Sequence, residues 1–421
     1  MNLTERDRKV LWHPYTQEKT APPPIGIVRG RGIWLETEDG REILDAISSW
    51  WVNIHGHAHP FLNEALAHQA TELEHTMFAG FTHKPAVELA EKLVAILPKG
   101  LTRVFYSDNG STAVEVALKM AYQFWQNRGQ ARKTFVALEN AYHGDTLGAM
   151  SASDKSAFTK SFVPLLFDVL RAGNIENIEQ IFRENSNQIA AVILEPMLQG
   201  AGGMIVWEKQ FLSDVRKLCN QYNVLLIADE VLTGFGRTGK MFACEHAAVS
   251  PDIICLSKAL TAGYLPLGAT VATEEIYRAF LSDDRMKTFF HGHSFTANPL
   301  ACAVAAASLE LLERENCLEK IAFINRKFNE RLPKLLDLDC VGDVRVIGAV
   351  GAVEIISDDG YFANIGQTLY QEFLYRRILL RPLGNVLYFM PPYLIQEREI
   401  DWVLDEIAEV LDDVNRKFQR K

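Results

Sequence analysis

The sequence predicts an α/β protein with a large domain built on a mainly parallel sheet and a smaller α+β domain. Three observations predict this. From about residue 101, short apolar runs alternate with amphipathic helical patterns. After about residue 301 this alternation stops. The chain also has 421 residues, which is long enough for two packed domains. Strand–helix alternation is typical of a parallel sheet covered by helices.

Six continuous apolar runs have the composition of strands that are buried on both faces. They are residues 103–106, 134–138, 189–194, 224–228, 252–256 and 268–272. Between them, residues 112–125 and 208–222 carry apolar side chains at helical spacing. Parallel sheets bind their ligands beyond the carboxyl ends of the strands, so residues at those ends are the functional candidates.

The later part of the chain predicts the domain boundaries. A long helix over residues 301–315 is followed by a mixed segment that reaches the C-terminus. We expect residues 51–310 to form the large, cofactor-binding domain and residues 311–421 the C-terminal small domain. The N-terminal segment, residues 1–50, is expected to join the small domain.

Composition excludes several classes of protein. The formal net charge is −10, which argues against sequence-independent binding to nucleic acid or to an anionic membrane. The six cysteines are scattered without a CxxC pair, a pattern typical of reduced thiols in a cytoplasmic protein. The first residues contain no apolar signal core, and no apolar run approaches membrane-spanning length. We therefore expect a cytoplasmic protein.

Two charged residues follow neighbouring strands of the predicted sheet. Asp229 ends the run 224–228, and Lys258 comes just after the run 252–256. They are 29 residues apart, the length of one strand–crossover–strand unit, so they can lie at adjacent strand ends. Either residue alone is weak support, because charged residues at strand ends are usually solvated.

Two further motifs add a phosphate site and an aromatic ring. In residues 107–112, Gly110 permits a tight turn, and Ser111 and Thr112 offer hydroxyls at a helix N-terminus, although a plain helix cap has the same pattern. Tyr142 follows another strand and could stack on a planar ring. A phosphate cradle, a stacking ring, a carboxylate and an amine are what pyridoxal 5'-phosphate requires.

The expected chemistry assigns a role to each of these residues. Lys258 must lose its proton to bond covalently to the cofactor aldehyde, and burial near a cationic centre would lower its pKa. Asp229 would keep the pyridine nitrogen protonated, so that the ring accepts electrons. Lys258 would then carry the substrate Cα proton as general base and acid. The predicted catalytic residues are Lys258, Asp229 and Tyr142.

These motifs resemble those of the class III (ω-amino-acid) aminotransferases, which are fold-type I enzymes dependent on pyridoxal phosphate. The resemblance covers almost the whole chain and is strongest in residues 226–239 (LIADEVLTGFGRTG) and 257–268 (SKALTAGYLPLG). It implies that Val231 lies on the ring face opposite Tyr142. It also implies a homodimer with shared active sites, in which His293 and Ser294 reach the partner's phosphate and Gly292 takes part in substrate binding.

Within the class, the chain is similar to the branch that converts 8-amino-7-oxononanoate to 7,8-diaminononanoate in biotin biosynthesis. The motifs that carry this similarity are residues 12–16 (WHPYT), 48–51 (SSWW), 381–384 (RPLG), Tyr388 and 390–393 (MPPY). The implied substrate is an apolar chain that ends in a carboxylate. Tyr15, Trp50 and Tyr142 would wall the chain, with Tyr388 nearby, and Arg381 would bind the carboxylate bidentately.

The resemblance further implies a ping-pong reaction of two half-reactions through pyridoxamine phosphate. The branch's commonest amino donor is S-adenosylmethionine, whose sulfonium Tyr15 and Trp50 could hold by cation–π attraction, and lysine is the alternative donor. One departure is His293-Ser294, where the family usually has Pro-Thr; serine keeps the hydroxyl, but the loop lacks the proline constraint. Acetylornithine, 4-aminobutyrate and glutamate-semialdehyde aminotransferases remain alternatives, because they share the catalytic core.

Two rival interpretations come from other classes of protein. Residues Gly234 to Lys240 fit both GxGxxG and GxxxxGK, which would indicate a nucleotide-binding protein. However, Met241 stands where a P-loop needs serine or threonine. His55, His57 and His59 alternate as strand ligands of a metal could, but no cysteine or carboxylate accompanies them in the sequence. Gly56 and Pro60 favour a loop there, and we expect no metal.

Overall fold

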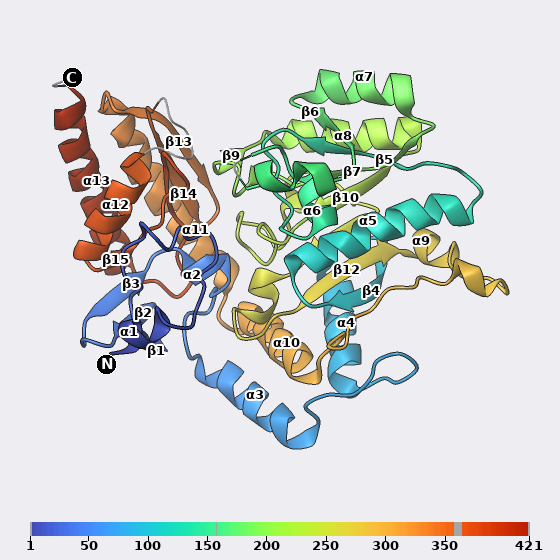
Figure 1. Cartoon of the computed structure of the whole chain (residues 1–421), viewed down its shortest axis with the longest axis horizontal. Coiled ribbons are helices and arrows are strands. Elements are labelled where there is room, and N and C mark those ends of the chain that lie inside the picture. The colour runs from blue at the N-terminus through green and yellow to red at the C-terminus, as the bar shows by residue number, and fades with distance from the viewer. Residues whose placement is uncertain (1, 157, 358–363, 420–421) are drawn as a thin grey trace.

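The computed structural model describes residues 2–156, 158–357 and 364–419. Its centre is a seven-stranded sheet in the order β4-β12-β11-β10-β7-β5-β6 (Figure 1). The strands are β4 (Leu101–Ser107), β5 (Thr134–Leu138), β6 (Val169–Ala172), β7 (Ile189–Leu194), β10 (Leu225–Asp229), β11 (Ile253–Leu256) and β12 (Gly268–Thr273). Only β12, among these seven, runs against its neighbours, so the predicted α/β fold with a mainly parallel sheet is confirmed.

Side chains of the central strands are buried on both faces of the sheet. In β7, Ile193 belongs to one apolar core, and its neighbours Val192 and Leu194 belong to the other. In β10, Ile227 belongs to the same core as Ile193, and Leu226 belongs to the same core as Val192. Successive residues of a strand point to opposite faces, so a continuous apolar run needs a helical layer on each side. All six predicted strands are confirmed, and two-sided burial explains the apolar runs of central strands such as β7 and β10.

The strand β6 was not predicted from the sequence. Its four residues include Arg171, which donates hydrogen bonds to the carbonyl oxygens of Ser151 and Ser153. The run is therefore too short and too polar for an apolar pattern to mark it.

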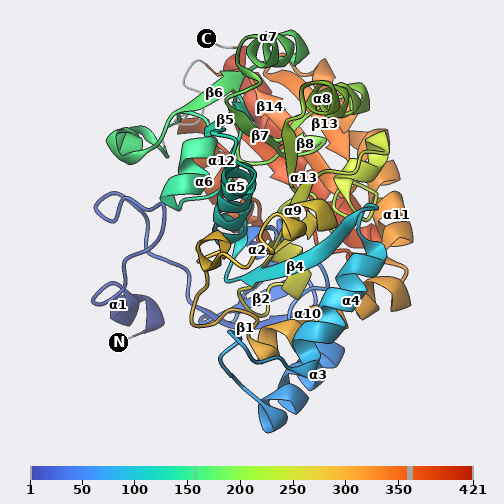
Figure 2. The same cartoon turned by 90° about the vertical axis from the view of Figure 1, so that its right-hand side faces the viewer.

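Helices cover both faces of this sheet, and α5 is seen nearly along its axis in Figure 2. The predicted helices over 112–125, 208–222 and 301–315 correspond to α5, α8 and α10. The helices of this part of the chain are α3 (Pro60–Glu72), α4 (Lys84–Ile96), α5 (Gly110–Asn127), α6 (Leu147–Ala152), α7 (Ile175–Asn185), α8 (Lys209–Tyr222), α9 (Glu274–Arg278) and α10 (Pro299–Arg314).

Within the described ranges the chain forms three smaller sheets, and one of them combines strands from both ends of the chain. One sheet has the order β1-β2-β3-β15, from β1 (Ile27–Arg31), β2 (Trp34–Thr37), β3 (Glu42–Asp45) and β15 (Ile378–Leu379). A second is β13-β14-β16, from β13 (Val341–Ile347), β14 (Val350–Ile355) and β16 (Val386–Phe389), and a two-stranded ribbon joins β8 (Leu198–Gln199) to β9 (Ile205–Val206). The remaining helices are α1 (Leu3–Asp7), α2 (Ser48–Trp51), α11 (Cys317–Arg331), α12 (Asn364–Tyr375) and α13 (Glu397–Phe418).

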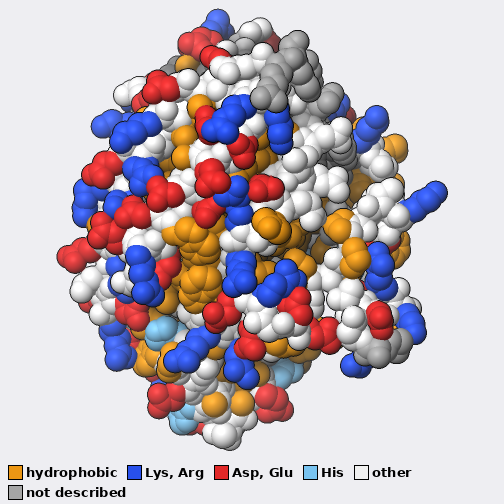
Figure 3. All heavy atoms as spheres, turned by 90° about the vertical axis from the view of Figure 1, so that its left-hand side faces the viewer, with side chains coloured by type: hydrophobic (Ala, Val, Ile, Leu, Met, Phe, Trp, Pro, Cys, Tyr) orange, Lys and Arg blue, Asp and Glu red, His pale blue; other side chains and the backbone are white. Residues whose placement is uncertain are grey.

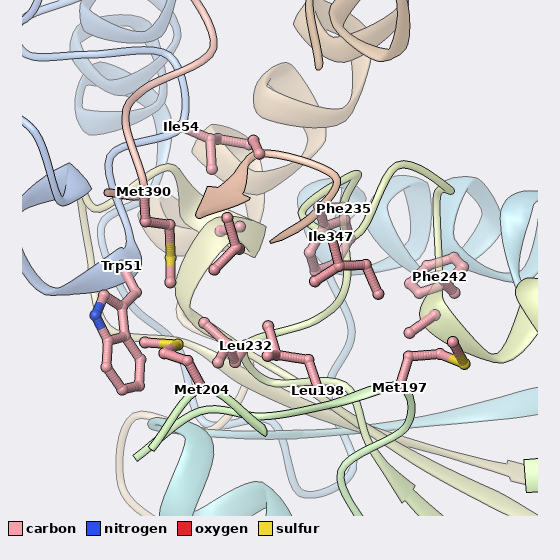
Figure 4. Close-up of a cluster of buried hydrophobic side chains, with 14 of the residues drawn as sticks. Trp51, Ile54, Met197, Leu198, Met204, Leu232, Phe235, Phe242, Ile347 and Met390 are labelled. Atoms are coloured by element: carbon pink, nitrogen blue, oxygen red, sulfur yellow. The ribbon is translucent and has the colours of Figure 1, made fainter. Parts of the chain in front are cut away.

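The division of the chain at residues 50 and 310 stays a prediction, and the sheet β1-β2-β3-β15 supports it. In Figure 1 the elements from both ends lie on one side, and the seven-stranded sheet lies on the other. Figure 4 shows a buried apolar cluster between these parts, which includes Trp51, Met204, Leu232, Phe235 and Met390. Apolar burial therefore joins the two parts of the molecule.

The surface on the side of α12 and α13 mixes charges of both signs (Figure 3). Arg376 illustrates this, since it forms ion pairs with Glu372, Glu406 and Glu409. A face of this kind lacks the uniform positive potential that binds nucleic acid without sequence preference. Among the described residues, no helix has both the length and the apolar character needed to cross a membrane.

Candidate active site

A cavity of about 370 Å³ opens beyond the carboxyl ends of β10 and β11. We call it the cofactor chamber. Most of the residues predicted to bind the cofactor line it, namely Gly110, Ser111, Tyr142, Asp229, Val231 and Lys258. Parallel strand ends converge at this edge of the sheet, so residues far apart in the sequence meet there.

Asp229 is the last residue of β10 and is almost fully buried. Its Oδ2 lies 2.7 Å from Nδ1 of His143, and its Oδ1 accepts a hydrogen bond from the backbone amide of Val231 at 3.1 Å. His143 is also buried. These two contacts fix the orientation of the carboxylate, which is what a partner for a ring nitrogen requires.

Lys258 lies two residues after β11 and begins a short 3-10 turn, Lys258–Thr261. Its φ of 47° is in the left-handed region, which a side chain other than glycine adopts at a cost of about 1 kcal/mol or more. The side chain is largely buried, and Nζ lies 4.4 Å from the ring centroid of Trp51. The surrounding fold therefore holds this lysine in a strained conformation at the cavity wall.

The pKa of Lys258 is lowered to about 8, mainly by burial and to a smaller extent by the charge of Arg237. Asp229 and Glu195 act in the opposite direction, because their negative charges favour the ammonium form. Desolvation is the largest of these effects, as the sequence reasoning anticipated. An unprotonated lysine is the form that can attack an aldehyde.

Glu195 was not predicted from the sequence, although it lines the same chamber. Its two carboxyl oxygens accept hydrogen bonds from the backbone amides of Tyr142 and Gly200, at 3.0 and 2.9 Å. Burial raises the pKa of Glu195 to about 7, and the charge of Asp229 also raises it. In the sequence, only the position of Glu195 directly after the apolar run 189–194 could have indicated a functional role.

The far wall of the chamber is the N-terminus of α5. The first backbone hydrogen bond of this helix joins the amide of Ala113 to the carbonyl of Asn109, so the amides of Gly110 and Ser111 lie ahead of it. Free amides and the helix dipole together favour an anion at this point. The Thr112 hydroxyl was predicted to face the phosphate site. It is instead bound within the helix cap, to Asn109 and Asp108.

Two glycines are needed for the chamber's shape. A Cβ built on Gly110 would lie 2.7 Å from Cγ1 of Val231, and one on Gly144 would lie 2.1 Å from Oγ of Ser111. Both distances are shorter than a van der Waals contact. The chamber therefore has a phosphate-sized anion site at one end, an anchored carboxylate within it and an amine at its wall, which fits pyridoxal 5'-phosphate.

A second, smaller cavity of about 140 Å³ adjoins the first, and Lys258, Tyr142, Trp50 and Trp51 line both. We call it the substrate chamber. The predicted residues Tyr15, Trp50, Tyr142, Arg381 and Tyr388 all line it. Phe158 and Leu383 also line it, and neither was predicted.

Tyr15 reaches this chamber from the N-terminal segment, which Figure 2 shows in dark blue at the edge of the molecule. Its hydroxyl lies 3.2 Å from the hydroxyl of Tyr142 and also bonds to Asp145. Its ring lies 5.7 Å from those of Trp50 and Phe158, measured between centroids. The aromatic rings thus form one continuous wall.

Arg381 lies at the outer end of the substrate chamber, and its guanidinium is 5.1 Å from the ring centroid of Trp50. Its side chain is exposed, so water or a ligand can reach it. Tyr388 lies deeper, where its hydroxyl accepts a hydrogen bond of 3.0 Å from Nε1 of Trp51. An apolar channel that ends at an arginine is the shape that the predicted substrate needs.

The loop that carries both tryptophans is held in an unusual conformation. Ser48, Ser49 and Trp51 have φ values of 51°, 57° and 69°, which are left-handed. Asp45 stabilises this loop, because its carboxylate accepts hydrogen bonds from the amide and the hydroxyl of Ser49, each at 2.8 Å. Ser48 donates a further hydrogen bond to the carbonyl of Met390. The wall of the substrate chamber is thus fixed from β3 and from the segment after β16.

Gly292, His293 and Ser294 do not line either chamber of their own chain. Nδ1 of His293 lies 2.7 Å from Oδ2 of Asp108, next to the start of α5. Gly292 and Ser294 are exposed. Their predicted role therefore depends on a second subunit.

The segment from Gly234 to Lys240 is not a nucleotide loop in this structure. Its first five residues are buried, and Phe235 packs against Phe242 with 5.5 Å between ring centroids (Figure 4). A short 3-10 turn, Ala243–Ala247, follows instead of a long helix. A phosphate site needs exposed amides at a helix N-terminus, so the nucleotide-binding alternative is not supported.

Comparisons with known proteins agree with this geometry. A family model described as aminotransferase class-III matches residues 15–411. The chain is 49% identical to the adenosylmethionine-8-amino-7-oxononanoate aminotransferase of Synechococcus elongatus, over 96% of this chain and 99% of that protein. It is 43% identical to the enzyme of the same name from Geobacter sulfurreducens, over 98% of each chain.

Solved structures give the same result. The crystal structure of adenosylmethionine-8-amino-7-oxononanoate aminotransferase from Methanocaldococcus jannaschii superposes with a TM-score of 0.94 at 39% identity, covering 98% of both chains. An omega transaminase from Pseudomonas jessenii, in complex with PMP, superposes with a TM-score of 0.93 at 29% identity, covering 99% of both chains. The range that the family model matches includes the residues from Tyr15 to Tyr388 that form the two chambers.

Proposed function

The chain belongs to the class III aminotransferases, and we propose that it converts 8-amino-7-oxononanoate to 7,8-diaminononanoate in biotin biosynthesis. It is an enzyme of the fold-type I class that depends on pyridoxal 5'-phosphate. The observation that carries the proposed substrate is the aromatic substrate chamber between Lys258 and Arg381. Relatives with the corresponding name, 38–49% identical over most of the chain, support it.

Pyridoxal phosphate, when bound, supplies an aldehyde that bonds to amines and a ring that accepts electrons. In our proposal, Gly110 and Ser111 of α5 hold its phosphate, and Asp229 holds a proton on its ring nitrogen. Val231 and Tyr142, which line the same chamber, enclose the ring from its two faces. His143 is a positioning residue, because it contacts the Asp229 carboxylate.

We assign the proton transfer to Lys258. Its Nζ would accept the proton from the substrate Cα and then deliver a proton to the second reacting carbon. The lowered pKa of Lys258 supports this assignment, because it leaves a substantial unprotonated fraction near neutral pH. Trp51 shields Nζ on one side, which limits the access of water.

The substrate chamber favours this keto-amine over the substrates of other ω-aminotransferases. Tyr15, Trp50 and Phe158 present rings rather than charges along the path from Lys258 to Arg381. A long methylene chain gains about 0.8 kcal/mol for each CH₂ that such a wall buries. Arg381 would bind the terminal carboxylate through two parallel hydrogen bonds.

For the amino donor we propose S-adenosylmethionine, with lysine as the alternative. The exposed rings of Tyr15 and Trp50 support a sulfonium donor, because a cation is attracted to aromatic faces. The guanidinium of Arg381 already lies over Trp50, so that ring has a face suited to a cation.

We also propose a homodimer with shared active sites, in which Gly292, His293 and Ser294 act on the partner's chamber. An apolar groove of about 910 Å³ supports the dimer, with Phe105, Tyr277, Phe280, Leu281 and Phe289 among its lining residues. Phe290 and Phe295, on either side of the 292–294 loop, are 69% and 63% exposed. Apolar exposure on this scale is typical of a surface that another chain covers.

A cytoplasmic location is part of the proposal. All six cysteines lie within the described residues, and each is free and buried. Free thiols of this kind are typical of a reducing compartment.

The test is a titration of the purified enzyme, loaded with cofactor, with 7,8-diaminononanoate. We expect the yellow absorbance of the aldehyde form to bleach, and Lys258→Ala to show no turnover. A yellow protein that ignores the diamine would contradict the substrate but keep the class, and other ω-amines would then be compared. A protein that stays colourless after addition of pyridoxal phosphate would contradict the whole proposal.

A further inference from the structure

A second group of reactive side chains lies where α10 meets α11, away from the two chambers. One ligand atom from each of His55, Glu315 and Cys317 lies within 4.8 Å of the other two. His55 and Cys317 are buried, and Glu315 is partly exposed. Glu315 caps the end of α10, and Cys317 is the first residue of α11. None of these three residues lines the cofactor chamber or the substrate chamber.

Within the part of the chain that the structure describes, one ring nitrogen of His55 has a hydrogen-bond partner and the other has none. Its Nε2 lies 3.2 Å from the carbonyl oxygen of Ser308 and can donate to it. Its Nδ1 is buried and has no hydrogen-bond partner among the described residues. A buried polar atom without a partner is costly. Metal-binding histidines commonly donate their other ring N–H to a backbone carbonyl, which leaves a lone pair for the metal.

His59 lies next to this set and contacts its carboxylate, without belonging to it. Its Nε2 lies 3.2 Å from Oε1 of Glu315, and its ring centroid lies 6.3 Å from that of His55. With bonds of about 2.0–2.3 Å, two ligands of a tetrahedral zinc ion are roughly 3.4 Å apart. The ligand atoms of His55, Glu315 and Cys317 lie within 4.8 Å of one another, so small side-chain rotations would close the set around a cation.

We propose that His55, Glu315 and Cys317 bind a divalent cation of the zinc type, with water as the fourth ligand. Nitrogen, sulfur and carboxylate donors together favour zinc over magnesium or calcium, which prefer oxygen alone. The alternating histidines have no such partners nearby in the sequence, and the fold brings Glu315 to His59 from 256 residues away. His57 takes no part, because its Nε2 contacts Asp45.

Bound metal at this position would join two parts of the enzyme. His55 precedes α3, and the other two ligands span the junction between α10 and α11. In Figure 1, α10 lies under the large sheet and α11 lies beside β14. The cation would therefore stabilise the connection between the two domains without touching the reacting atoms.

Lys320 sets the strength of the site. Its Nζ lies 2.7 Å from Oε2 of Glu315 and so places a competing positive charge beside the carboxylate. Oε1 of Glu315 remains directed at His59. Removal of the lysine charge should strengthen metal binding, whereas a merely structural ion pair would predict no gain.

The experiment is a Co²⁺ titration of the cofactor-loaded enzyme, stripped of metal beforehand and followed through the visible bands of tetrahedral cobalt. We expect one Co²⁺ per chain. Cys317→Ser should weaken binding at least tenfold and remove the sulfur-to-cobalt charge-transfer band. Cys302→Ser, a change at a buried cysteine in α10, is the matched control and should bind cobalt as the unmodified enzyme does.

Two variants at partly exposed positions keep the proposal testable if Cys317→Ser does not fold. Glu315→Gln should weaken binding at least tenfold, and Lys320→Gln should strengthen it several-fold. Both should leave the cofactor spectrum unchanged. The proposal is overturned if no saturable site of one Co²⁺ per chain is found, or if Cys317→Ser and Glu315→Gln bind cobalt as tightly as the unmodified enzyme.

Discussion

Lys258 and Glu195 line the same chamber, and burial moves their pKa values towards each other, to about 8 and about 7. An ordinary lysine and an ordinary glutamate differ in pKa by roughly six units. Within the chamber, each group can therefore change its protonation near neutral pH. The arrangement suits a reaction in which a proton leaves one carbon and returns to another.

The lowered pKa of Lys258 predicts the pH dependence of cofactor capture. In the cofactor-free enzyme, the rate of binding pyridoxal phosphate should rise through pH 8, because only the unprotonated amine attacks the aldehyde. Stopped-flow absorbance at a series of pH values measures this. An inflection near the ordinary lysine value of 10.5 would contradict the assignment.

The same shift has a consequence for stability. Between about pH 8 and pH 10.5 the unfolded chain keeps the lysine proton that the folded chain has lost. The contribution of Lys258 to the free energy of unfolding should therefore rise with pH over this window. Lys258→Met should remove that slope from denaturant unfolding curves of the cofactor-free enzyme.

Arg381 is predicted to recognise the substrate carboxylate. Arg381→Met should lower kcat/KM for 8-amino-7-oxononanoate about 10- to 100-fold, because it removes charge-assisted hydrogen bonds worth about 1.5–3 kcal/mol. An analogue of the substrate without the carboxylate is the control, and its kcat/KM should hardly change. Equal losses with both compounds would show that Arg381 acts on the chamber's structure instead.

At the scale of elements, the N-terminus of α5 and the turn after β10 are packed together through Gly110 and Val231. Gly110→Ala would place a Cβ 2.7 Å from Cγ1 of Val231, so the phosphate end must shift. Such overpacking costs about 1–3 kcal/mol and should weaken cofactor binding tenfold or more. Equilibrium titration with pyridoxal phosphate measures this loss.

The double variant Gly110→Ala with Val231→Ala is the matched control. It should recover much of the lost cofactor affinity, because the shorter side chain at position 231 makes room for the added methyl. The next atom near that methyl, Cβ of Ser257, lies at an ordinary contact distance of 3.6 Å. A double variant no better than the single one would contradict the packing explanation.

The elements also explain what the sequence could and could not predict. Strands such as β7 and β10 were predictable, because burial on both faces leaves a continuous apolar run. Phe158 was missed because no local pattern marks it, whereas Glu195 was marked only by its place directly after the apolar run 189–194. Gly292, His293 and Ser294 lie outside their own chain's chambers, so a single chain cannot test them.

At the scale of the whole molecule, the apolar groove along β4 and α9 predicts how the enzyme assembles. Leu281 lines this groove and is 59% exposed, so its replacement should not disturb the fold of one chain. Leu281→Asp would place a charge in the proposed dimer interface and should shift the enzyme towards monomers, as measured by light scattering.

Tyr375→Asp is the control for that change, since Tyr375 is 84% exposed at the end of α12, far along the chain from the groove. It should leave the mass of the assembly unchanged. A monomeric unmodified enzyme with full activity would contradict both the dimer and the shared active sites.

The parallel pairing of β3 with β15 joins residues 42–45 to residues 378–379, near opposite ends of the chain. During synthesis, an N-terminal segment that needs such a distant partner must wait until most of the polypeptide has left the ribosome. Trp50 follows β3 and Arg381 follows β15, so the substrate chamber closes only when this last pairing forms. A chain truncated before β15 would then lack the Arg381 end of the substrate chamber, and specificity would be the final property that the nascent enzyme acquires.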